Sequence, residues 1–273
     1  MNRPIFIIGA PRSGTSLLYA ILRQSSKLKH WPGESHEIWE ADYHPALRGW
    51  SSNALDASDL NDQAAARIRR NFFLVTGRNH FLLDKTPRNA LRVPFVDALF
   101  PDARYVYLQR DGRENINSLI NAWRTPRYRT YELPQPHSIS GVDPKWWKFV
   151  LYPGWGDDTN RSLEVVCARQ WISCNDQALL ASKDIGLDRW VEIRYEDLIG
   201  RPIDEVGRIL EFLELPYERG VKEKAIATET TPINTVTPPE RGKWRRENPN
   251  EIAAIAEMIR PTMEALGYRV DED

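Results

Sequence analysis

The chain has 273 residues, enough for one large α/β domain with a substantial hydrophobic core. Its formal net charge of -1 gives no overall positive field that would attract nucleic acid or an anionic membrane surface. An anionic ligand must therefore be bound by local clusters of cations, and we expect no nucleic-acid partner. The sequence leaves the oligomeric state open.

The start of the chain and its two cysteines bear on the compartment. The apolar run at residues 4–8 is too short for a signal peptide or a membrane span and fits a buried strand. Taken as the whole gene product, the sequence predicts a cytoplasmic protein with no membrane span; the open alternative is a targeting segment or membrane anchor that has been removed. Cys167 and Cys174 lie two helical turns apart, too distant for a disulfide and too few for a zinc site. We expect both to be reduced, partly buried thiols.

Apolar periodicity predicts strands that alternate with helices along most of the chain. The predicted strands cover residues 4–9, 81–85, 103–109 and 189–195. The predicted helices cover residues 16–26, 88–100 with an interruption near Pro94, 112–123, 162–182, 203–215 and 248–267, the last with Asn248 as its N-cap and Pro249 in its first position. This alternation indicates parallel βαβ units, and we predict one α/β domain over residues 1–273 with a central parallel sheet flanked by helices.

One segment, residues 124–161, interrupts this alternation. It is rich in proline and tryptophan and shows little periodicity. A long irregular insertion in a compact domain is often functional, so we expect it to shape a binding pocket. Its tryptophans have two open roles, ligand stacking or core packing, and its arginines can bind an anion or face solvent; these residues are Trp146, Trp147, Trp155, Arg124, Arg127 and Arg129.

The sequence GAPRSGTS at residues 9–16 follows the first predicted strand and is nearly a phosphate-binding P-loop. The usual form is G-x-x-x-x-G-K-[ST], but Thr15 occupies the lysine position and Arg12 is the cation of the loop. A glycine-rich turn that opens a helix points backbone N–H groups at an anion. The loop therefore predicts a P-loop NTPase-like fold; the alternative is a strand–helix turn with no ligand.

Two further cationic clusters accompany the loop. Arg110 follows the strand at 103–109, and Ser118 lies two turns into the next helix, so both can face one phosphate at the carboxyl edge of the sheet. A cation stands where a nucleotide hydrolase would carry a metal-binding acid, which favours an anion bound without metal. The third cluster surrounds Trp244 and consists of Arg241, Lys243, Arg245 and Arg246. The alternative for the cluster at Arg110 is a helix cap beside a surface arginine. The alternative for the cluster around Trp244 is a run of solvated basic residues.

In this order, these segments resemble the sulfotransferases that use 3′-phosphoadenosine 5′-phosphosulfate (PAPS). GAPRSGTSLL resembles their 5′-phosphosulfate loop, YVYLQRDGRENINSL their 3′-phosphate motif, and IRYEDL the segment whose tyrosine lies near the adenine. GKWRRE resembles the family's C-terminal segment of cations around a tryptophan. DKTPRN resembles the K-T-P or K-D-P element of the carbohydrate and tyrosylprotein branches. The resemblance implies PAPS as co-substrate and 3′,5′-adenosine bisphosphate (PAP) as product, bound without metal by Arg12, Ser13, Gly14, Thr15, Ser16, Arg110, Ser118, Tyr195, Arg241 and Lys243.

The resemblance also implies a catalytic base in PGESHEIWE, residues 32–40. We expect Glu34 to take the proton of the acceptor hydroxyl, with His36 in support and Glu37 as the reserve candidate. Lys85 is expected to approach the sulfate or the acceptor, and Arg12 completes the catalytic set. A glutamate that acts as a base near neutral pH would benefit from a raised pKa.

The acceptor remains open at this point, with a carbohydrate or another small alcohol favoured. Two other functions compete with sulfuryl transfer. A P-loop kinase or nucleotide hydrolase with a degenerate loop would bind ATP and depend on magnesium. A non-catalytic nucleotide-binding relative would bind the nucleotide without turnover.

Overall fold

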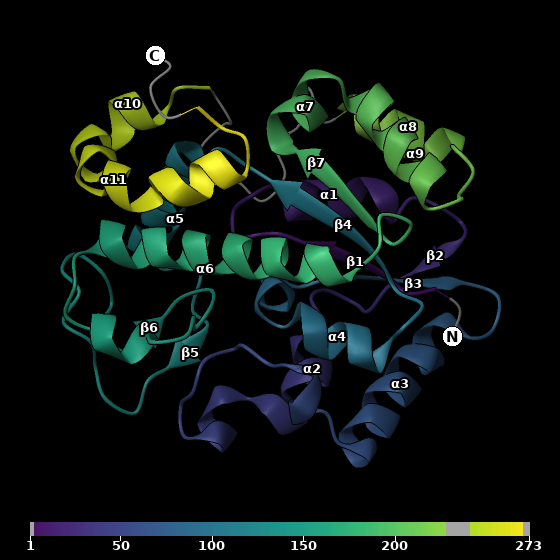
Figure 1. The fold of residues 1–273 in the computed structure, drawn as a ribbon, viewed down its shortest axis with the longest axis horizontal. Helices are drawn as coiled ribbons and strands as arrows, with labels where there is room; N and C mark the ends of the chain where they lie inside the picture. The colour runs from purple at the N-terminus through teal and green to yellow at the C-terminus, as the bar shows by residue number, and fades with distance from the viewer. Residues whose placement is uncertain (1–2, 228–240, 270–273) are drawn as a thin grey trace.

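Five parallel strands form the central sheet of this computed structural model, which describes residues 3–227 and 241–269 (Figure 1). The strands lie side by side in the order β2-β3-β1-β4-β7. Their bounds are β1 Ile5–Ile8, β2 Leu28–Lys29, β3 Phe81–Lys85, β4 Arg104–Gln109 and β7 Trp190–Arg194. Ile5 of β1 pairs with Leu83 on one side and with Arg104 on the other, so β1 is the point from which the chain extends the sheet in both directions.

The strands are apolar because both faces of the sheet are covered. Successive side chains of a strand point to opposite faces. In β1, Ile5 and Ile7 belong to one hydrophobic cluster, and Phe6 and Ile8 belong to the other. Each face therefore has its own core, as the continuous apolar run at the start of the chain predicts.

The helices divide between these two cores. Figure 1 shows α7, α8 and α9 together on one side of the sheet and α2, α3 and α4 on the opposite side. The first core is covered by α1 Thr15–Leu22, α7 Tyr195–Gly200, α8 Pro202–Phe212 and α9 Arg219–Ala227. The second is covered by α2 His36–Tyr43, α3 Asp62–Thr76, α4 Val93–Leu99, α5 Gly112–Arg124, α6 Leu163–Asp184 and α11 Pro249–Ala265.

Short elements complete the chain. They are the 3-10 helices Pro45–Arg48, Ala57–Asp59, Pro87–Leu91 and Trp155–Asp158, the short helix α10 Trp244–Glu247, and the antiparallel pair β5 Tyr131–Glu132 and β6 Trp146–Trp147. The pair β5–β6 lies in the segment 124–161. Trp147 of this segment is fully buried, so it packs in the core and does not face a ligand.

The predicted α/β fold with a parallel sheet is confirmed, and two local predictions are refined. The predicted helix at 88–100 is a 3-10 helix and α4, separated at Arg92. Asn248 occupies the N-cap position of α11, but its side chain makes no capping bond and instead bonds to Asn117 and Asn121 of α5. Both cysteines are free and fully buried, more so than predicted. None of the helices described is long and apolar enough to cross a membrane.

Candidate functional site

The candidate site lies where the carboxyl ends of β1, β3 and β4 meet. In parallel sheets this edge, at the strand where the order reverses, is the usual place for a ligand. The glycine-rich loop leaves β1 here, Lys85 is the last residue of β3, and Arg110 follows β4. Tyr195 begins α7 directly after β7. The topology thus brings four separately predicted segments to one edge.

The glycine-rich loop has the backbone that an anion-binding turn requires. Gly14 is the N-cap of α1 with a φ of 103°, which is the left-handed region that glycine adopts freely. A side chain at this position would also collide with the ring of Tyr195. Ser13 is 1% exposed, and its hydroxyl has no hydrogen-bond partner among the described residues. A buried hydroxyl without a partner is costly, so this loop is suited to a ligand that accepts a hydrogen bond.

Arg12 joins the loop to α5 and to the segment 124–161. Its Nε donates to Ser118 Oγ at 3.4 Å, and its Nη1 donates to the hydroxyl of Tyr128 at 3.1 Å. The guanidinium also lies over the Tyr128 ring, 5.0 Å from the centroid. These contacts tie the cation of the loop to α5 and to the segment 124–161 through two hydroxyls and an aromatic ring.

Arg110 contacts the same loop from the other side. Its Nη1 donates to the carbonyl of Arg12 at 2.9 Å, and its guanidinium lies 4.4 Å from the centre of the Tyr195 ring. The buried Nε of Arg110 has no hydrogen-bond partner among the described residues. The two predicted anion sites, with Arg110 and Ser118 in the second, therefore adjoin and share Arg12.

The basic segment near the C-terminus is tied to α5. The backbone N–H of Gly242 donates to Glu114 Oε1 at 2.5 Å. Lys243 is buried, and its Nζ lies 3.5 Å from Glu247. Arg241 is exposed. The structure thus anchors this predicted segment to the helix that begins after Arg110.

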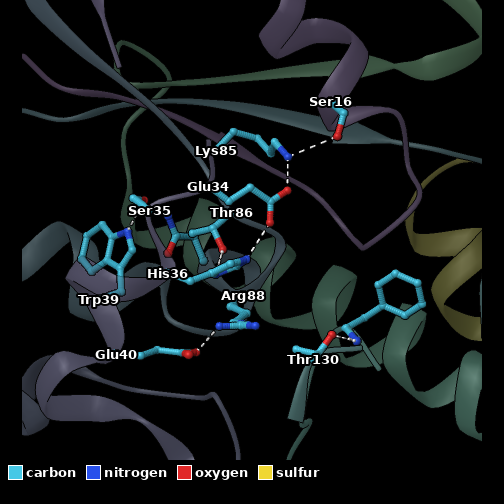
Figure 2. A network of polar contacts seen from close by, with 12 residues as sticks. Ser16, Glu34, Ser35, His36, Trp39, Glu40, Lys85, Thr86, Arg88 and Thr130 are labelled. Atoms are coloured by element: carbon cyan, nitrogen blue, oxygen red, sulfur yellow. Dashed lines mark hydrogen bonds and ion pairs between the residues drawn. The ribbon is translucent and has the colours of Figure 1, made fainter. Parts of the chain in front are cut away.

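Glu34 lies at the centre of a chain of polar contacts (Figure 2). Its Oε1 accepts from Lys85 Nζ, and its Oε2 lies 2.6 Å from His36 Nε2. Lys85 also donates to Ser16 Oγ of the glycine-rich loop at 3.2 Å. On the far side, His36 Nδ1 lies 2.9 Å from the Thr86 hydroxyl. The predicted base, its supporting histidine and the predicted lysine are therefore in direct contact with one another and with the loop.

The pKa of Glu34 is lowered, whereas a base that acts near neutral pH would benefit from a raised one. Burial favours the neutral acid, but the hydrogen bond from His36 and the charge of Lys85 outweigh it and lower the pKa of Glu34 to about 2. The reserve candidate has a different environment: Glu37 Oε1 accepts from Trp31 Nε1 at 2.6 Å. Glu34 is thus the acid that contacts both Lys85 and His36.

A buried network fixes the backbone around Glu34. Ser35 donates to the buried carboxylate of Asp84, and that carboxylate also accepts from Trp39 Nε1 at 3.2 Å and from Asn89 Nδ2 at 2.9 Å. Asp84 precedes Lys85 in β3. The loop that carries the predicted base and the strand that carries the lysine are therefore bonded to each other at adjacent residues.

Sequence reasoning did not identify Asp84, Thr86 and Tyr128 as site residues. Asp84 and Thr86 stand in the quoted sequence DKTPRN, whose polar residues interrupt an apolar strand end, and that interruption was the available signal. Tyr128 stands in the segment 124–161, where no periodicity singles it out. Across residues 3–227 and 241–269, no three histidine, cysteine or acidic side chains gather as metal ligands do. The expectation of metal-free binding stays a prediction.

The chain is similar in sequence to known proteins over most of its length. The family model described as "Sulfotransferase family" matches residues 4–146 and 138–219. Protein-tyrosine sulfotransferase A of Caenorhabditis elegans is 22% identical over 289 residues, which covers 97% of this chain and 67% of that protein. The chain thus spans about two thirds of that relative's length.

Solved structures share the fold. Sulfotransferase STF9 from Mycobacterium avium superposes with a TM-score of 0.59 at 16% identity, over 100% of this chain and 79% of that one. Mouse sulfotransferase SULT7A1, complexed with PAP, superposes with a TM-score of 0.51 at 11% identity, over 96% of this chain and 84% of that one. At these identities the likeness concerns the arrangement of the sheet and its helices.

Proposed function

The chain belongs to the sulfotransferase family, and on that premise we propose that it transfers a sulfuryl group from PAPS to the phenolic hydroxyl of a peptide tyrosine. PAPS as donor agrees with the PAP complex of the mouse structural neighbour. A tyrosine acceptor follows the name of the Caenorhabditis elegans relative and replaces the carbohydrate favoured from the sequence. Family membership favours this activity over the kinase and the non-catalytic alternatives.

The donor requires two anion-binding regions, and the site offers two that adjoin. The loop from Gly9 to Ser16, with Arg12 and the Ser13 hydroxyl that has no partner among the described residues, fits the 5′-phosphosulfate. Arg110 and Ser118 fit the 3′-phosphate, with the ring of Tyr195 stacked on Arg110. The buried Nε of Arg110, which has no partner in the part of the chain that the structure describes, supports this fit, because a bound anion would satisfy it.

A single observation carries the proposal: Lys85 Nζ contacts both the phosphate loop and the predicted base. It lies 3.2 Å from Ser16 Oγ and forms an ion pair with Glu34. Sulfuryl transfer to a hydroxyl needs a base on the acceptor and a cation near the oxygen that leaves the sulfur. Lys85 is 5% exposed and is held where it can serve the second need next to the group that serves the first.

The ion pair also explains how a glutamate with a low pKa can act as a base. Glu34 accepts from Lys85 in the structure, and an anion in the adjacent loop competes for the same ammonium group. When Lys85 turns toward that anion, one of the two groups that lower the pKa of Glu34, the other being His36, acts on it less strongly. PAPS supplies the activated sulfuryl group; Glu34 then takes the phenolic proton, and His36 keeps its carboxylate in place.

Two measurements on the purified protein test the proposal. Calorimetric titration with PAP, and with ATP with and without magnesium, should give tight metal-independent binding of PAP and weak binding of ATP. Incubation with PAPS and a tyrosine peptide should then give a sulfated peptide, with the same peptide carrying phenylalanine as the control. Tight magnesium-dependent ATP binding without a preference for the 3′-phosphate would contradict the proposal. If the protein binds PAP but sulfates an oligosaccharide and not the peptide, the proposed donor stands and the proposed acceptor is wrong.

A further inference from the structure

Thr86 is a buried residue whose hydroxyl does not do what its position suggests. It is the N-cap of the 3-10 helix Pro87–Leu91, where a threonine hydroxyl usually accepts from a backbone N–H of the first turn. Thr86 makes no such bond. Its side chain is fully buried, and its Oγ1 lies 2.9 Å from Nδ1 of His36, fifty residues away in the sequence. The hydroxyl therefore forms a hydrogen bond with the histidine and does not cap the helix.

The direction of the two hydrogen bonds of His36 follows from the ionisation of Glu34. Lys85 holds the Glu34 carboxylate ionised, and an ionised carboxylate only accepts hydrogen bonds. Nε2 of His36 lies 2.6 Å from Glu34 Oε2 and must therefore carry a proton. In a neutral imidazole Nδ1 then has none, so it accepts the hydroxyl proton of Thr86.

The groups around His36 favour that neutral imidazole. Burial and the neighbouring cation of Arg88 lower the pKa of His36, although Glu34 and Glu40 act against them. Arg88 is itself held by an ion pair with Glu40, with 2.5 Å between Nη1 and Oε1. Figure 2 shows this pair below the chain that runs from Lys85 through Glu34 and His36 to Thr86.

We propose that Thr86 is a positioning residue, whose hydroxyl donates to Nδ1 of His36, fixes the Nε2–H tautomer and so directs that N–H at the catalytic carboxylate of Glu34. The inference rests on the proposed role of Glu34 as the base. A neutral donor orients the carboxylate without adding a second positive charge to that of Lys85. A protonated His36 would make the same contact but would weaken Glu34 as a base.

The test compares Thr86→Val, which keeps the shape and removes the hydroxyl, with Thr86→Ser, which keeps the hydroxyl. The first readout is the ¹⁵N spectrum of the imidazoles in the full-length free protein, with the His36 signals identified by their loss in His36→Gln. Wild type and Thr86→Ser should show the Nε2–H tautomer. Thr86→Val should show mixed tautomers or an imidazolium whose pKa is raised relative to wild type.

The second readout is turnover with PAPS and the tyrosine peptide. Thr86→Val should lower kcat about tenfold, the loss expected for one hydrogen bond, and should shift the acidic limb of the pH profile upward. Its KM for PAPS should stay within about twofold, and Thr86→Ser should restore kcat. Loss of the hydroxyl should thus act on the base and not on the donor site.

The two readouts separate the inference from the proposed function. A wild-type spectrum with the proton on Nδ1 overturns the inference without any variant, even if Thr86→Val does not fold. An unchanged tautomer and an unchanged pH profile in Thr86→Val overturn it as well. A changed tautomer in a protein that sulfates no acceptor would uphold the hydrogen-bond geometry and reject the enzymatic function.

Discussion

The two halves of the site handle charge in opposite ways. On the β4 side, Arg12 and Arg110 donate to hydroxyls and a carbonyl and stack on tyrosine rings, and a nitrogen of Arg110 is buried with no partner among the described residues. On the β3 side, both oxygens of the Glu34 carboxylate already have partners, Lys85 and His36. The β4 half offers an anion the buried Nε of Arg110, which has no partner among the described residues, whereas the β3 half holds its reactive carboxylate in contacts that must change.

This difference shows that the reactive half of the site depends on the anion-binding half. Lys85 is the group that both halves share, because it contacts Ser16 of the phosphate loop and Glu34. An anion bound in the phosphate loop therefore acts on the Glu34 carboxylate through Lys85. The comparison predicts that substitutions on the β3 side change chemistry, whereas substitutions on the β4 side change nucleotide affinity.

The largest expected effect is that of Glu34→Gln. The amide keeps the size of the side chain but cannot take a proton, and loss of a general base costs about 10²–10⁴-fold in turnover. Affinity for PAP should stay within a few-fold, because the β4 side is untouched. The assay is sulfation of the tyrosine peptide together with calorimetry of PAP binding. An unchanged rate would remove Glu34 from the mechanism and end the contrast between the halves.

Arg110→Ala should give the converse result. One charge-assisted hydrogen bond contributes about 1.5–3 kcal/mol, so affinity for PAP should fall about 10–100-fold. Affinity for adenosine 5′-phosphate, which lacks the 3′-phosphate, should change little. Arg201→Ala, which removes an exposed arginine of the α7–α8 turn, is the matched control and should leave both affinities unchanged. Equal losses for the two nucleotides would reject Arg110 as the 3′-phosphate ligand.

Lys85→Met tests the link between the halves. Burial raises the pKa of Glu34, while His36 and Lys85 lower it, so removal of Lys85 should raise the pKa from about 2 by roughly one unit or more. The sign follows because a nearby cation stabilises the ionised form. Carboxyl ¹³C titration of the free protein measures it, with Lys29→Met of the exposed β2 end as the control. A pKa that stays near its wild-type value would show that His36, and not Lys85, accounts for the lowering.

The fold was predictable where short-range patterns decide it. The apolar run at Ile5–Ile8 predicts a buried strand, and the spaced glycines that follow it predict an anion-binding turn. The helices α2 and α3 were missed. In α2 only Ile38, Trp39 and Tyr43 are buried, so its sequence shows a weak apolar stripe.

The proximity of the candidate site residues was predictable from the sequence, whereas their electrostatics was not. Arg12 and Arg110 follow predicted strands and Lys85 ends one, and parallel strands bring their carboxyl ends together. Glu34 follows no predicted strand and was proposed from the family resemblance. The pKa of Glu34 depends instead on a lysine 51 positions away, which no local pattern reveals. The side chain of Asn248 likewise bonds across to α5, although its position marks it as a helix cap.

The smallest expected effect is that of Glu37→Gln, which separates the two candidate bases. Glu37 lies in the first turn of α2 and accepts from the indole of Trp31, and a glutamine oxygen accepts the same bond. Turnover should stay within about twofold of wild type, and stability should change by no more than about 0.5 kcal/mol, as for most surface substitutions. Peptide sulfation and thermal unfolding of Glu37→Gln beside Glu34→Gln provide the measurement. If Glu37→Gln lost as much turnover as Glu34→Gln, proton transfer would need both acids. The contacts of Glu34 with Lys85 and His36 would then not be enough to identify it as the sole base.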